Sequence, residues 1–156
     1  MAASLQIRLT GGAGNSNPNL SLGGVMSSTQ LSATPMNNLF DNIDPTEAEN
    51  GDVEYRALDI HNAGDAAATS ISLYLSSETT SPSTDLDFGL DATTQSVGAE
   101  GTAPSGVTFD HYNSSNKLSI SDIAASGSQR FWVRRTVNAG AANLNNDTCT
   151  LKVEYA

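Results

Sequence analysis

The chain has 156 residues, of which 38% are hydrophobic, and its 17 acidic and 7 basic side chains give a formal net charge of −10 at pH 7. This length suits one domain, residues 1–156, which can bury a core without disulfides or metal ions. The negative charge repels phosphate backbones and disfavours a nucleic-acid partner. No run approaches the roughly 20 apolar residues of a membrane-spanning helix, so we expect no membrane partner.

The first predicted strand lies near the N-terminus, where Leu5, Ile7 and Leu9 alternate with polar residues. The residues before it contain no basic segment followed by an apolar one, so we expect no secretory signal. Residues 11–34 are rich in Gly, Ser, Asn and Thr with scattered apolar side chains. We expect them to form an irregular arm or long loop that is mobile in the free protein.

One short helix is predicted in the first third of the chain. Asp44 supplies an N-cap, Pro45 a first helical residue, Glu47 the partner of a capping box and Gly51 a C-terminal stop. We expect about two turns of helix. The apolar residues 39–40 are expected to pack over an open end of the fold.

The central region predicts three further strands, at residues 53–60, 70–76 and 85–91. In the first of them the apolar phase changes between Tyr55 and Leu58, which indicates a β-bulge or a strand that passes between sheets. The second alternates cleanly. The third has one apolar face, and its other face carries Asp85, Asp87 and Asp91.

The remaining strands complete an all-β pattern. About seven to nine short strands separated by turn residues predict an immunoglobulin-like β-sandwich with one short helix, and a jelly roll is the alternative. We expect the loops at 76–84 and 92–106 to be mobile when the protein is alone. The later strands are predicted at residues 107–109, 118–120, 129–137 and 149–155.

The strand at residues 129–137 carries the most distinctive pattern. A period of two places the only tryptophan and two arginines on the face opposite Phe131, Val133 and Val137. Because Trp and Arg dominate interface hot spots, an outward orientation predicts a docking surface, with an acidic strand face of a neighbouring copy as its complement. The alternative is a face covered by the chain itself, with the arginines paired internally. The interface candidates are Arg130, Trp132, Arg134, Asp85 and Asp87.

No motif predicts catalysis, a metal or a cofactor. Neither His61 nor His111 lies in a general-base motif, and the sequence has no nucleophile elbow, zincin helix or phosphate loop, so we expect a non-enzyme. The acidic groups within residues 41–52 and 85–91 have the chemistry for Ca²⁺ but not the spacing of a calcium loop, and a solvated acidic surface is favoured. Cys149 is predicted to be a small buried side chain.

Three stretches together resemble a group of small structural proteins encoded by tailed bacteriophages. They are residues 38–41 with 51–56, residues 60–62 with the strand that follows, and residues 131–141 with 146–147. The similarity extends from residue 5 to the end of the chain. It implies an immunoglobulin-type sandwich on the outside of a virus particle.

The resemblance implies a virion structural protein without enzymatic activity, made in the host cytoplasm. A capsid decoration (cement) protein, which binds and stabilises the outer surface of the head, fits best. Its expected partners are the major capsid protein and further copies of itself, as a homotrimer at a symmetry axis. The alternative is a tail, neck or fibre component with a receptor- or carbohydrate-binding role, for which Trp132, Tyr74 and Tyr112 are the candidate aromatic residues.

Overall fold

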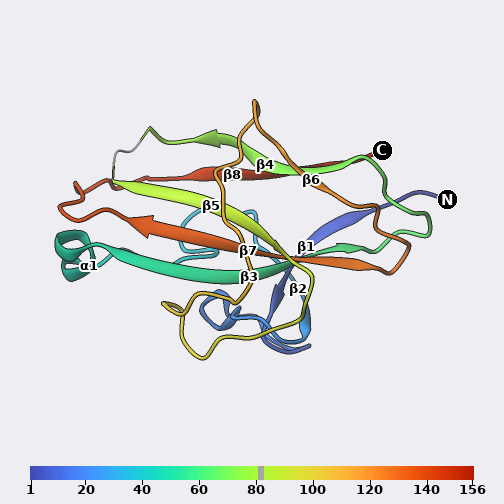
Figure 1. Cartoon of the computed structure of the whole chain (residues 1–156), viewed down its shortest axis with the longest axis horizontal. Helices are drawn as coiled ribbons and strands as arrows, with labels where there is room; N and C mark the ends of the chain where they lie inside the picture. The colour runs from blue at the N-terminus through green and yellow to red at the C-terminus, as the bar shows by residue number, and fades with distance from the viewer. Residues whose placement is uncertain (81–82) are drawn as a thin grey trace.

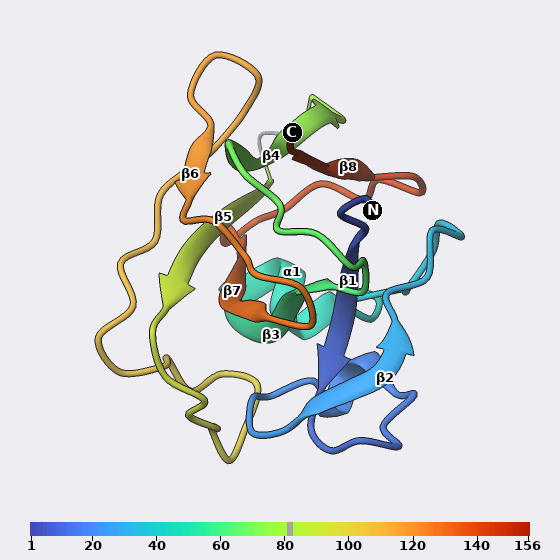
Figure 2. The ribbon, with the colours of Figure 1, turned by 90° about the vertical axis from the view of Figure 1, so that its right-hand side faces the viewer.

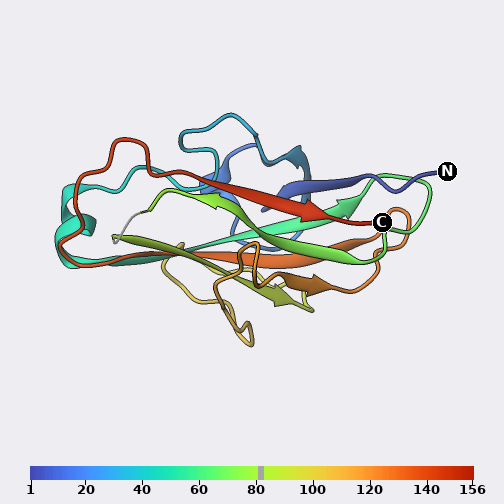
Figure 3. The same ribbon diagram turned by 90° about the horizontal axis from the view of Figure 1, so that it is seen from above.

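The computed structural model describes residues 1–80 and 83–156. In these ranges the chain forms a β-sandwich of two antiparallel sheets with one short α-helix, which confirms the predicted fold class. Both termini lie at the end of the sandwich opposite the helix α1 (Figure 1 and Figure 3). The loop predicted at 76–84 overlaps two strands, and residues 81–82 lie outside the described part.

The two sheets differ in size, with five strands in the order β2-β1-β3-β7-β5 and three in the order β6-β4-β8. Figure 2 shows them stacked when viewed along the sandwich. The strands of the larger sheet are β1 (Leu5–Thr10), β2 (Met26–Gln30), β3 (Asp52–Asn62), β5 (Thr84–Asp91) and β7 (Ser128–Val137). Those of the smaller sheet are β4 (Ile71–Glu78), β6 (Leu118–Ile120) and β8 (Cys149–Glu154).

The strand order follows the immunoglobulin plan. The run β1-β3-β7-β5 corresponds to strands A, B, E and D of that fold, and the pair β4-β8 corresponds to C and F. The connection between β5 and β7 crosses to the smaller sheet and adds β6 beside β4. Beyond β8, where immunoglobulin domains place strand G, the described residues contribute no strand.

The main core lies between the two sheets. The alternating residues of β4 supply Ile71, Leu73 and Leu75, each at most 2% exposed. They pack with residues of the larger sheet, where the rings of Phe88 and Phe131 meet edge to face with centroids 6.3 Å apart. Burying one such side chain contributes about 1.5–3 kcal/mol, so this cluster holds the sheets together.

Strand β3 pairs with its neighbour in a continuous register and has a buried cluster on each face. It pairs with β7 from Asp52 to His61 without a register shift, so the predicted bulge or sheet change is wrong. Leu58 faces the main core, while Tyr55 belongs to a second cluster with Trp132 on the other side of the sheet. The change of apolar phase therefore marks a strand buried on both faces.

Residues 11–34 are more regular than the sequence predicts. They contain a 3₁₀ turn at Pro18–Leu20 and strand β2, which pairs with β1 across a register shift. Backbone bonds hold the connection, including Gly12 N to Val25 O at 3.0 Å and Ser28 N to Ala13 O at 2.9 Å. The expectation of an irregular segment is therefore wrong at Met26–Gln30, where pairing with β1 supplies the order that the apolar pattern lacks.

Helix α1 (Pro45–Asn50) forms as its caps predict. Asp44 Oδ1 accepts hydrogen bonds from the backbone N–H groups of Thr46 and Glu47 at 2.7 and 2.9 Å, and Glu47 Oε2 accepts one from Asp44 N at 2.7 Å. Leu39 and Phe40, just before the helix, pack against the main core. No helix in the described ranges has the length and apolarity needed to cross a membrane.

Candidate functional site

The predicted docking face lies on the outer side of β7 but is covered by the chain itself. Arg130, Trp132 and Arg134 share this face, opposite Phe131 and Val133, as the period of two predicts. Trp132 is 0% exposed and Arg130 is 5% exposed. A docking surface built on these two side chains is therefore wrong, and the alternative of a cover formed by the chain itself is confirmed.

The indole of Trp132 lies under the connection that follows β5. Its register partners on the neighbouring strands are Ala57 and Gly89, whose small size leaves room for the ring. Val97, Val107 and Phe109 of the connection pack against the cluster that contains Trp132. A Cβ atom at Gly89 would lie 2.4 Å from Val107 Cγ1, so the covering segment fits closely over this strand. The loop predicted at 92–106 is thus part of the second core.

The indole N–H of Trp132 donates to Asp91 Oδ2 at 2.8 Å. The same carboxylate accepts hydrogen bonds from the backbone N–H of Thr93 at 2.8 Å and from Gln95 Nε2 at 3.0 Å. Burial opposes the charge of Asp91, but the hydrogen bonds from Thr93, Trp132 and Gln95 outweigh it and lower its pKa. Asp91 therefore fastens both the ring and the segment that covers it.

Arg130 forms a buried bidentate pair with Asp59, its neighbour across the ladder. Nε donates to Asp59 Oδ1 at 2.8 Å and Nη2 to Oδ2 at 2.9 Å. Nη2 also donates to the carbonyl oxygen of Gly24 at 2.7 Å, which joins the β1–β2 connection to the outer face. Such fork-shaped pairs fix geometry as well as charge, so Arg130 acts as an internal clamp.

Arg134 is the most accessible of the predicted interface cations, with its side chain 32% exposed. Its Nη2 donates to Asp87 Oδ2 at 2.5 Å, and its guanidinium lies 5.0 Å from the centroid of the Phe109 ring. Asp87 thus pairs within its own chain, which contradicts the prediction that it meets an arginine of another copy. Asp85 is exposed on the same face.

A second polar cluster lies on the core-facing side of the larger sheet, next to α1. Arg135 donates to Glu54, its register partner, and Arg135 Nη1 donates to Asp41 O at 2.7 Å. The guanidinium groups of Arg135 and Arg56 lie 4.9 and 5.1 Å from the ring centroid of Phe40. Burial raises the pKa of Glu54, even though Arg135 and Arg56 act in the opposite direction.

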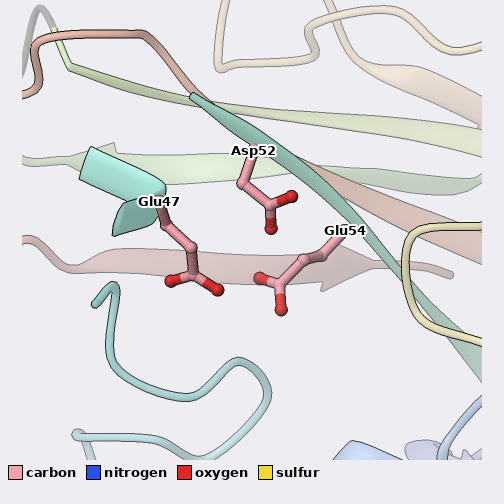
Figure 4. A group of neighbouring side chains, drawn as sticks. All are labelled: Glu47, Asp52 and Glu54. Carbon is pink, nitrogen blue, oxygen red and sulfur yellow. The ribbon is translucent and has the colours of Figure 1, made fainter. Parts of the chain in front are cut away.

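Three carboxylates meet beside this cluster. Glu47, Asp52 and Glu54 each place an oxygen within 4.8 Å of the others (Figure 4). Hard cations such as Ca²⁺ prefer this kind of donor set. The sequence groups Asp41, Asp44 and Asp52 instead; in the structure Asp44 caps the helix and Asp41 contacts Arg135. The turn at Gly51 explains the difference, because it brings Glu47 of the helix beside β3.

The histidines do not form catalytic pairs with serine among the described residues. The two ring nitrogens of His111 contact Leu86 O at 2.9 Å and Glu78 Oε2 at 3.1 Å. Burial opposes protonation of His111, but these contacts raise its pKa overall. Burial and the charge of Arg8 lower the pKa of His61. His111 therefore has no ring nitrogen left to activate a hydroxyl.

A polar cluster that the sequence pattern did not indicate lies on the outer face of the smaller sheet. Glu154 accepts hydrogen bonds from Tyr74 Oη and Lys117 Nζ, both at 2.7 Å, and Lys152 Nζ lies 3.0 Å from it. Hydrogen bonds from Lys117, Tyr74 and Lys152 lower the pKa of Glu154 to about 2. These residues come from three strands or their flanks, so only the register reveals them.

Cys149, predicted to be buried, is exposed at the start of β8. The register shift between Leu75 and Ser77 of β4 lies beside this end of β8. The alternation that points the later residues of β8 into the core therefore does not extend to Cys149. Partial desolvation of the sulfur, together with the carboxylates of Glu78 and Asp147, raises the pKa of Cys149 to about 11. The thiol therefore stays protonated at neutral pH.

Comparison with known proteins gives no relative for this chain. None of these comparisons links the chain to the phage structural proteins that the sequence resemblance suggests. No family model, no curated protein and no solved structure matches the sequence or the fold.

Proposed function

We propose that the chain is a non-enzymatic structural protein of a phage particle, a decoration protein that binds the outer surface of the head. Its partners are the major capsid protein and, in a homotrimer, other copies of itself. The observation that carries this proposal is the open margin of the sandwich at β8. The sequence resemblance supplies the class of particle, and the margin supplies a place for contact.

The open margin combines an unpaired strand edge with accessible apolar side chains. In the described chain β8 pairs with β4 on one side only. Its inward residues Leu151 and Val153 are half-buried, as are Leu5 and Ile7 of β1, and all four pack against the same core cluster. An extended segment added beside β8 would complete the small sheet and cover these side chains.

Such an edge suits a protein that binds many identical sites. Backbone hydrogen bonds along an added strand give affinity, and pockets for its alternate side chains give specificity. Side chains pack against both faces of the five-stranded sheet, so we expect little conformational freedom to be lost on binding. Both features favour a decoration protein, which must attach repeatedly to a lattice in one orientation.

The receptor-binding alternative is weakened, because the aromatic residues proposed for it are not exposed. A carbohydrate site needs exposed aromatic rings, but Trp132 is 0% and Tyr74 is 4% exposed. Tyr112 is half-buried and packs against the main core. The candidate rings are thus engaged in the fold, and no specific contact favours a tail or fibre role.

The test mixes purified protein with expanded, empty heads of the phage and measures bound protein and amide hydrogen exchange. We expect saturation at a stoichiometry set by the lattice symmetry and new protection of the amides of residues 149–154. The amides of residues 118–120, at the other margin of the same sheet, serve as the internal control and should not change. Absence of saturable binding would overturn the function, while saturable binding without protection of β8 would overturn the proposed contact.

A further inference from the structure

The carboxylates of Glu47, Asp52 and Glu54 converge at the end of the sandwich that carries α1 (Figure 4). Gly51 adopts φ 80°, a conformation that side chains rarely allow, and this turn places the helix alongside the start of β3. Asp52 and Glu54 then project from the same face of β3 because they are two residues apart. The three side chains are therefore held together by backbone geometry.

Glu54 supplies a second, independent observation that points to a ligand at this cluster. Its side chain is 2% exposed, and Oε1 is buried without accepting a hydrogen bond in the described residues. The other oxygen, Oε2, receives Arg135. Arg56 Nη2 lies 3.8 Å from Oε1, beyond hydrogen-bond distance. A buried carboxylate oxygen without a donor is costly, and its side chain points toward Glu47 and Asp52 (Figure 4).

The local charges leave two negative groups without a basic partner. Arg56 donates to Glu100 at 2.8 Å, and Arg135 pairs with Glu54. Glu47 and Asp52 form no ion pair in the described part of the chain. Two uncompensated carboxylates beside a buried third one match the charge of a divalent cation.

We propose that Glu47, Asp52 and Glu54 bind a divalent cation, with Ca²⁺ preferred over Mg²⁺. Ca²⁺ accepts carboxylates in a flexible geometry and completes its shell with water, whereas Mg²⁺ requires a strict octahedron and loses water reluctantly. The ion ties α1 to β3 and closes the end of the sandwich over Arg135 and Phe40. With few protein ligands, we expect a dissociation constant of about 10⁻⁴–10⁻³ M, as in extracellular calcium modules.

The test uses chelator-treated protein titrated with CaCl₂ by calorimetry, together with thermal unfolding. We expect one site per chain and an increase in Tm of about 2–5 °C at ten times the dissociation constant. Glu47→Gln and Asp52→Asn, which keep the shape of each side chain, should weaken binding at least tenfold. Asp122→Asn, at an exposed acidic residue of the β6–β7 connection, is the matched control and should bind like the unmodified protein.

Three outcomes would overturn the proposal. One is that CaCl₂, at a concentration of 10 times the highest expected dissociation constant, gives no heat of binding and no change in Tm. Another is an equal response of Asp52→Asn and Asp122→Asn, which would mean general screening of the acidic surface. The third is a response to MgCl₂ that equals or exceeds the response to CaCl₂. Far-UV circular dichroism without the ion verifies that each variant is folded, and Tb³⁺ luminescence reports binding at the same carboxylates if a variant is less stable.

Discussion

The two outer faces of the sandwich carry the same kinds of side chain in opposite settings. On the five-stranded sheet, Trp132 lies between Arg130 and Arg134, with carboxylates on both neighbouring strands, under a cover of connecting segments. On the three-stranded sheet, Tyr74 contacts two lysines that share one glutamate, and nothing in the described chain covers the charged ends. One arrangement is a second core, whereas in the other the ring of Tyr74 is buried and only its charged partners are solvated.

The difference shows that burial, rather than residue type, decides how much such a cluster contributes to the stability of the fold. Inside the cover, an ion pair or a charged hydrogen bond acts in a low dielectric, so removing one partner leaves an uncompensated charge. At the open face, water and salt replace most of what a lost contact supplied. We therefore expect the same type of substitution to give large effects on the first face and small ones on the second.

The largest effect is expected from Trp132→Ala. Removal of a fully buried indole leaves a cavity between Ala57, Gly89 and the covering segment, and should lower the free energy of unfolding by up to about 5 kcal/mol. Urea denaturation followed by circular dichroism measures this loss, and Trp132→Phe is the control that keeps most of the volume. Weaker self-association or head binding with an unchanged free energy of unfolding would show instead that this face is a docking surface.

Arg130→Met should cost about 3 kcal/mol, because it leaves the buried carboxylate of Asp59 without its partner. The double variant Asp59→Leu with Arg130→Met removes both charges and should recover most of that loss. Urea denaturation of the two single variants and the double variant gives the coupling free energy. If the losses of the single variants simply add, the pair is not the internal clamp that its geometry indicates.

Asp91→Asn should cost about 2 kcal/mol at pH 7, since hydrogen bonds to a charged acceptor are among the stronger ones. The folded-state pKa of Asp91 lies below its ordinary value of 3.8, so its contribution is present above that pH and is lost as the pH falls through the lower folded value. Unfolding free energies of both proteins should therefore converge below pH 3.8. A difference that stays constant down to pH 2 would assign the loss to packing rather than charge.

Strand periodicity predicted on which face of its strand each side chain lies, but not which of the two faces another segment of the chain buries. Alternation correctly placed Ile71 and Leu73 in the core, and it correctly separated Trp132 from Phe131. A period of two is symmetric, so it cannot tell which face a distant segment will cover. The small partners of Trp132, here Gly89, are a usable signal, but only once the register is known.

The acidic cluster shows a second limit of sequence analysis. Glu47 and Asp52 are separated by a helix end and a turn. Neither the helix period of 3.6 residues nor the strand period of two describes that junction. The caps predict that the helix stops at Gly51, yet the direction in which the chain leaves depends on the φ of that glycine. Strand β2 was missed for a related reason, because its polar sequence pairs through a shifted register with β1.

The smallest effect on the free energy of unfolding is expected from Glu154→Gln on the open face. The pKa of Glu154 is about 2, below its ordinary value of 4.5, so its contribution to stability is present above pH 4.5 and is lost as the pH falls toward 2. An NMR titration should place the carboxyl near this pKa at low salt and shift it upward in 1 M NaCl, where the screening length is about 3 Å. Asp91 is the matched control, and its pKa should respond less because its carboxylate is buried and the donors named for it are uncharged. Equal salt responses of the two carboxyls would mean that the cover over Trp132 admits solvent, and the contrast between the faces would then be one of composition only.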